Sequence, residues 1–177
     1  MFGLAATLLA LSLTPITDGD DGPTPVISRN HPKLHLAGAQ RIVEGGLAKA
    51  REMKLAVNVA VVDDGGHLLA FARMDGARPA SVYTSLTKAT AAATLRQATG
   101  PSPAGAVQTD TLLSLSLQNA ASAGGGRMTS LKGGVPIVVD GQVVGAVGVG
   151  GGTGEQDSEV ARAGIAALEK ILEKERK

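Results

Sequence analysis

The apolar residues between positions 34 and 53 recur every three or four residues, the spacing of a helix buried along one side. They are Leu36, Ile42, Val43, Leu47, Ala50 and Met53. Residues 80–98 are rich in alanine and carry a second stripe at helical spacing, made of Val82, Leu86, Ala89 and Ala93. The pattern predicts two amphipathic helices. Gly45 and Gly46 weaken the first, and the small side chains of the second suit close packing against a sheet.

Two pairs of short apolar segments are each separated by a turn signal. Residues 55–62 and 67–73 flank the sequence Asp-Gly-Gly, and residues 135–139 and 142–149 flank Asp140-Gly141. An Asp-Gly pair readily adopts the positive φ angles that a tight type I′ turn requires. Each pair of segments therefore predicts a β-hairpin.

The remaining elements are a short middle helix and a C-terminal helix. Residues 109–119 predict the middle helix, after a loop at 100–105 and before an expected glycine-rich loop at 120–127. A glycine loop at 150–154 precedes apolar positions at helical spacing that run to position 172. The order of helices and hairpins predicts an α/β fold of the α+β kind, an antiparallel sheet with helices packed on it.

The composition of the chain limits the kinds of partner that it is expected to bind. Its 177 residues fit one domain, and 17 Lys and Arg against 16 Asp and Glu leave a net charge of +1. No nucleic-acid partner is expected from so balanced a charge. Cysteine is absent, which excludes disulfides and thiolate metal sites. Because aromatic residues make up only 2%, a site for a large flat ligand is expected to be shared between subunits.

The N-terminus begins with an uncharged apolar run from Phe2 to Ile16. The run is shorter than the roughly 20 residues of a spanning helix, so no stable membrane span is expected. It suits a secretory signal peptide, with a flexible arm as the alternative. We expect this segment to cover residues 1–30 and a single domain to cover 31–177. The protein would be secreted or periplasmic if the run is a signal, and otherwise cytoplasmic.

The glycine loop at 150–154 is the first candidate site. It follows a strand and precedes a helix, where backbone N–H groups can hold phosphate or carboxylate. It matches no nucleotide-binding motif, so no nucleotide is expected. The competing interpretation is structural, because Thr153 with Gln156 forms a capping box. Lys88 is either a surface residue or a second cation for an anionic ligand.

Histidines and one arginine supply the other candidates. His67 follows a Gly-Gly turn, where it could ligate haem iron or be an exposed turn residue. His31 and His35 are four residues apart, which would place two rings on one helix face, although Pro32 suggests that the helix only begins there. Arg73 could bind a ligand carboxylate through two hydrogen bonds or contact Asp75 locally.

Two long motifs resemble those of the GlcG/HbpS family, whose members include haem-degrading or DUF336-like domains. The first runs from Val61 to Ala77 and is followed by Lys88-Ala89; the second runs from Gly133 to Val149 and continues into residues 154–157. The resemblance covers residues 34–172. It implies a profilin-like or Roadblock-like domain, similar also to the C-terminal domain of PduO-type adenosyltransferases, assembled into homo-oligomers from dimers to octamers.

The resemblance also implies a function, the binding of haem or a related tetrapyrrole in a homo-oligomer. His67 or His35 would ligate the iron, and the candidate cofactor-binding residues are His67, His35, Arg73, Met74, Lys88, Gly151, Gly152, Thr153 and Gly154. One alternative is an enzyme or accessory protein acting on a small hydroxy or keto acid, with His67, Arg73 and Asp75 as the working cluster. Another is a purely structural or partner-binding oligomer.

Overall fold

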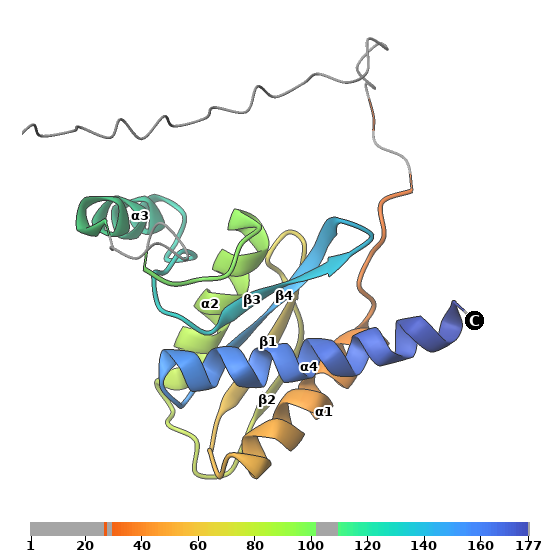
Figure 1. Ribbon diagram of the computed structural model, residues 1–177. Coiled ribbons are helices and arrows are strands. Elements are labelled where there is room, and N and C mark those ends of the chain that lie inside the picture. The colour runs from red at the N-terminus through yellow and green to blue at the C-terminus, as the bar shows by residue number, and fades with distance from the viewer. Residues whose placement is uncertain (1–26, 28–29, 102–109, 177) are drawn as a thin grey trace, which may run out of the picture. The chain divides into compact units, whose positions relative to one another are not determined.

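The computed structural model describes residues 27, 30–101 and 110–176 (Figure 1). The chain divides between Asn30 and His31, and every element below belongs to the unit that begins at His31. The predicted signal peptide or arm lies almost entirely outside the described residues. Within the described part of the chain, no helix is long and apolar enough to cross a membrane.

The centre of the fold is a four-stranded antiparallel sheet. Its strands are β1 (Asn58–Asp63), β2 (Leu68–Arg73), β3 (Gly134–Val139) and β4 (Gln142–Gly150), in the order β2-β1-β4-β3. Both predicted hairpins are present, and β1 pairs with β4 to join them into one sheet. Asp140 and Gly141 have φ angles of 49° and 76°, as the predicted type I′ turn requires.

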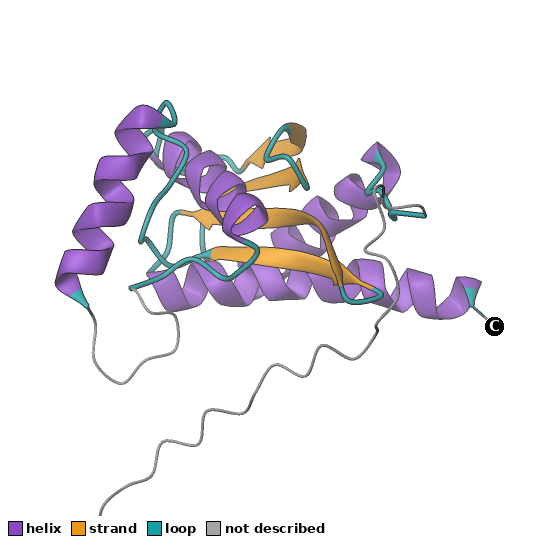
Figure 2. Cartoon of the chain, turned by 90° about the horizontal axis from the view of Figure 1, so that it is seen from above, coloured by secondary structure: helices purple, strands orange, loops and turns teal. Residues whose placement is uncertain are grey.

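Helices cover both faces of the sheet (Figure 2). Helices α1 (Leu36–Glu52) and α4 (Gly154–Glu175) pack on one face, and α2 (Ser81–Leu95) packs on the other. Alternate residues of β1 divide between the two cores, because successive side chains of a strand point to opposite faces. Val59 and Val61 join the core under α1 and α4, whereas Ala60 and Val62 join the core under α2. The predicted α+β class is therefore confirmed.

Glycine allows the helices to approach closely. A Cβ atom on Gly45 of α1 would lie 2.6 Å from the Cβ of Ala167 in α4, and one on Gly164 would lie 2.6 Å from the backbone oxygen of Ile42. Gly45, predicted to weaken α1, thus has a packing reason to be glycine. On the other face, a Cβ on Gly148 of β4 would overlap the backbone oxygen of Ser85, so α2 lies directly on the strand.

Three predicted boundaries differ from the structure by three or more residues. The helix predicted over residues 80–98 ends at Leu95, because Arg96 takes the left-handed conformation with φ of 55°. Helix α3 (Thr111–Ala123) continues through part of the expected glycine-rich loop. Its last residues are alanine and serine, which a helix accommodates, and glycines begin only at position 124. The strand predicted from residue 55 begins at Asn58.

Candidate functional site

A cavity of about 560 Å³ lies where α2 and α4 begin, and we call it the glycine-loop cavity. One face of α2 contributes Ser81, Thr84 and Lys88, whose spacing places them on the same side of a helix. The rest of the lining is Arg78, Ala80, Pro101, Ser130, Leu131, Lys132, Gly151, Gly152, Gly154, Glu155 and Asp157. The structure therefore brings together four of the predicted site residues: Lys88, Gly151, Gly152 and Gly154.

A buried ion pair forms the inner end of this cavity. Lys88 Nζ donates to Asp157 Oδ2 at 2.7 Å and to the Val149 carbonyl at 2.8 Å, and both charged residues are at most 5% exposed. The other carboxylate oxygen of Asp157 accepts the Gly152 N–H at 2.9 Å. Lys88 is thus a buried, paired residue, which corrects the surface interpretation, while its role as a cation for an anionic ligand stays a prediction. Asp157 was missed because its partner is 69 residues away in the sequence.

The start of α4 carries the predicted capping box. Thr153 Oγ1 accepts the Gln156 N–H at 3.3 Å, and Gln156 Oε1 accepts the Thr153 N–H at 2.9 Å. The Thr153 hydroxyl is thereby engaged inside the protein. The next N–H group, that of Gly154, has no acceptor among the described residues, whereas the Glu155 N–H bonds to the carboxylate of its own side chain. Gly154 and Glu155 both lie in the lining of the cavity.

The rim of the cavity holds a second, exposed ion pair. Lys132 Nζ lies 2.9 Å from Glu155 Oε1, and this hydrogen bond lowers the pKa of the Glu155 carboxyl below its ordinary value. Arg78 donates to the Gly151 carbonyl at 3.3 Å.

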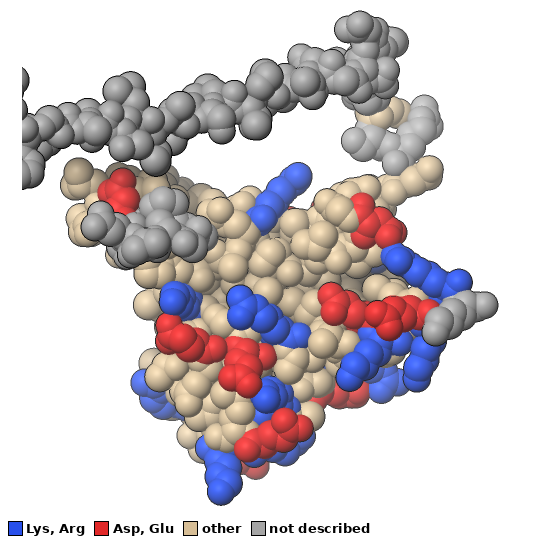
Figure 3. Space-filling view, viewed as in Figure 1, with Lys and Arg blue, Asp and Glu red and all other residues tan. Residues whose placement is uncertain are grey.

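Basic and acidic side chains intermix over the face shown in Figure 3. In another such pair, Lys49 Nζ lies 2.9 Å from Glu159 Oε1, and this hydrogen bond raises the pKa of the lysine.

A separate pocket of about 400 Å³ lies beside the start of α1 and the C-terminal half of α4, and we call it the α1–α4 pocket. Its lining includes six branched aliphatic residues: Leu34, Val139, Val144, Leu168, Ile171 and Leu172. Four charged or titratable side chains also line it: Lys33, His35, Arg41 and Glu175. His35 is the exposed N-cap residue of α1, and its imidazole makes no hydrogen bond to any described residue.

The other histidines are held by local contacts. His67 is 71% exposed, and its Nδ1 lies 3.3 Å from Asp63 Oδ1, the atom that also accepts the His67 N–H. His31 bonds to Gln142 and lies 3.4 Å from Asp64. Helix α1 begins only at Leu36, so His31 and His35 do not share a helix face, and that prediction is wrong. The described residues contain no cluster of three or more potential His, Asp or Glu metal ligands.

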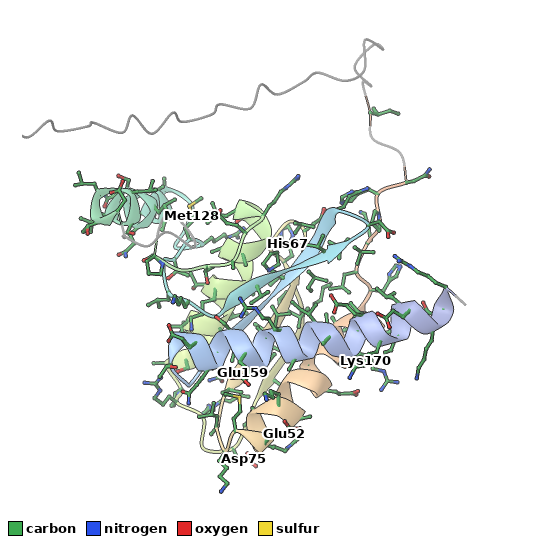
Figure 4. All side chains as sticks on the ribbon, viewed as in Figure 1. Glu52, His67, Asp75, Met128, Glu159 and Lys170 are labelled. Carbon is green, nitrogen blue, oxygen red and sulfur yellow. The ribbon has the colours of Figure 1, made fainter. Side chains whose placement is uncertain are left out.

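Arg73 and Met74 lie at the far end of β2 from His67. The Arg73 guanidinium donates to the Ala77 carbonyl at 3.1 Å rather than to Asp75, and Met74 packs against the core. Six strand residues separate His67 from Arg73 by about 20 Å, and His67 and Asp75 lie at opposite ends of the sheet in Figure 4. The predicted catalytic cluster of His67, Arg73 and Asp75 is therefore not formed.

The fold belongs to a known class of domain. The family model described as haem degrading protein HbpS-like matches residues 34–166. The chain belongs to this family. It is 43% identical to protein GlcG of Escherichia coli (strain K12) over 112 residues, which are 63% of this chain and 76% of GlcG.

Solved structures share the same fold. Protein ORFY of Klebsiella pneumoniae, a DUF336 protein, superposes with a TM-score of 0.68 at 31% identity, covering 82% of this chain and 98% of ORFY. A double mutant of HbpS of Streptomyces reticuli gives 0.64 at 29% identity, covering 83% and 98%. The complex of PduOC with heme gives 0.63 at 23% identity, covering 77% and 95%. The predicted family is confirmed.

Proposed function

We propose that this protein binds haem in the α1–α4 pocket, with the His35 imidazole as an axial ligand of the iron. The observation that carries the proposal is the position of His35, which lines an apolar pocket and has no hydrogen-bond partner among the described residues. A neutral imidazole is a common axial ligand of haem iron. His67, by contrast, contacts its own turn through Asp63.

The rest of the pocket suits the chemistry of a porphyrin. The aliphatic side chains of Leu168 and Leu172 offer an apolar wall to a flat ring. Lys33 and Arg41 could pair with the propionates, Arg41 through two hydrogen bonds. Bound haem would supply an iron centre for redox chemistry or ligand binding, while the chain supplies ligation, charge and burial.

The relatives support haem as the ligand. The matching family is described as haem degrading, and PduOC, which shares the fold, was solved with heme. A pocket of about 400 Å³ with aliphatic walls offers a porphyrin one covered face. We therefore propose that a second copy of the chain covers the other face in a homo-oligomer.

Haem titration of the purified protein tests the proposal. We expect a stoichiometric shift of the Soret band that His35→Ala abolishes or displaces. His67→Ala is the matched control and should bind like the wild type, because it removes an imidazole outside the pocket. Arg41→Ala should weaken binding about tenfold by removing a charged partner of a propionate. Equal Soret spectra for His35→Ala and the wild type would refute His35 as the ligand.

A further inference from the structure

The glycine-loop cavity contains a buried hydroxyl that the fold leaves unused. Ser81, the first residue of α2, is only 5% exposed and lines the cavity. Its hydroxyl makes no hydrogen bond to any described residue. Among these residues, Asn58 Oδ1 is the only fully buried side-chain polar atom without a hydrogen-bond partner. Because the Ser81 oxygen also lacks a partner, it cannot be fully buried. Its small remaining exposure is toward the cavity.

Buried hydroxyls normally find a partner, because burying one without a hydrogen bond is costly. Two neighbours on the same helix show the usual outcome. Ser85 Oγ donates to the Val82 carbonyl at 2.8 Å, and Thr84 Oγ1 donates to the Ser81 carbonyl at 3.2 Å. The unpartnered Ser81 hydroxyl therefore marks a position where a ligand can supply the partner.

The surroundings of the cavity also favour a negatively charged ligand. Both α2 and α4 begin at it, and the N-terminal end of a helix carries a partial positive charge. The first turn of α2 has no acidic residue. In α4, the carboxylate of Asp157 is already bonded to Lys88 and Gly152, and that of Glu155 is bonded to Lys132. The Gly154 N–H remains available as a donor.

Basic side chains add to the positive charge around the cavity. Arg78, Lys88 and Lys132 line the cavity against Glu155 and Asp157, so the lining carries one excess positive charge. An ammonium group has three N–H donors, and Lys88 Nζ uses two of them on Asp157 and Val149. A third donor therefore remains at the inner end of the cavity.

We propose that the glycine-loop cavity binds a small organic anion. Its carboxylate or phosphate oxygens would accept a hydrogen bond from the Gly154 N–H, and the Ser81 hydroxyl would bond to the same ligand. A cavity of about 560 Å³ is larger than a lone ion needs, so the anion carries an organic body.

This site is distinct from the proposed haem site. Glu155 lines the glycine-loop cavity and Ile171 lines the α1–α4 pocket. Sixteen residues of one helix separate them by about 24 Å. The two sites can therefore be tested independently, and neither result decides the other.

NMR titration of the ¹⁵N-labelled full chain tests the anion site. Glycolate, acetate and inorganic phosphate are added separately, and the amide signals of Gly154 and Glu155 are followed. We expect saturable shifts with at least one probe. Saturation by glycolate or acetate assigns a carboxylate ligand, and saturation by phosphate assigns a phosphate ligand.

Two serine variants on α2 provide the matched comparison. Ser81→Ala should weaken binding about tenfold, the effect of losing one hydrogen bond to a charged group. Ser85→Ala removes a buried hydroxyl that is bonded within the helix, and it should bind like the wild type. The haem titration of Ser81→Ala should be unchanged. The proposal is overturned if no probe gives saturable shifts, or if the two variants bind the probes equally.

Discussion

Lys88 of α2 and Asp157 of α4 form an ion pair of 2.7 Å that connects helices on opposite faces of the sheet. The pair lies at the end of β4, where the Val149 carbonyl accepts a second hydrogen bond from the same ammonium group. Both side chains are buried. The contact therefore ties the two helical layers together around the end of the sheet.

Removing one member of this pair should leave the other charge buried without a partner. We expect Lys88→Met to lower the free energy of unfolding by about 3–5 kcal/mol, as for other broken buried pairs. The double variant Lys88→Met with Asp157→Leu should recover part of the loss, because no buried charge remains. Urea denaturation of the three proteins measures this. A double variant less stable than Lys88→Met would contradict the explanation.

Helices α1 and α4 pack so closely that even one added methyl group between them should destabilise the protein. We expect Gly45→Ala to lower the free energy of unfolding by about 1–3 kcal/mol, because the new Cβ overlaps its neighbour. Gly124→Ala is the control, since a Cβ there meets its nearest atoms at 3.8 Å. Thermal melting of both variants gives the comparison. If Gly45→Ala melted at or above the wild-type temperature, the close packing would be disproved.

The capping box at Thr153 should contribute measurably to α4. Replacing Thr153 by alanine should cost about 1 kcal/mol, because the Gln156 N–H loses its acceptor. Thr87→Ala is a suitable control, since the Thr87 hydroxyl bonds to the Tyr83 carbonyl within α2 and caps no helix. Chemical denaturation should show a loss for the first variant only.

The stability contribution of Glu155 should depend on pH. Its hydrogen bond to Lys132 lowers the folded-state pKa below the ordinary 4.5. The contribution is therefore present above pH 4.5 and is lost as the pH falls through the lowered pKa. We expect Glu155→Gln to be slightly less stable than the wild type at neutral pH and equally stable in acid. Because the pair is exposed, added salt should shrink the difference. A difference that grew in acid would contradict this assignment.

Local sequence chemistry predicted the hairpins and the helix cap. Asp140-Gly141 specifies its turn through backbone conformation, and Thr153 with Gln156 specifies the cap through side chains three residues apart. Both depend only on neighbouring residues, and both are confirmed by the structure. The family motifs in turn predicted the fold class.

Contacts between distant residues were not predictable in this way. The pairing of Lys88 with Asp157 depends on how α2 and α4 are placed around the sheet. The unpartnered hydroxyl of Ser81 is likewise a property of the packed structure, since nothing in the sequence distinguishes it from Ser85. The predicted cluster of His67 and Arg73 failed because closeness in the sequence becomes distance along an extended strand.

The pairing of β1 with β4 also constrains the order in which the protein folds. Asn58 pairs with Gly150, 92 residues further along the chain, so the two hairpins cannot join until that long loop closes. During synthesis, one edge of β1 stays unpaired until β4 has left the ribosome. Contacts of such long sequence separation slow folding. The unpaired edge of β1 is then open to pairing with the wrong chain.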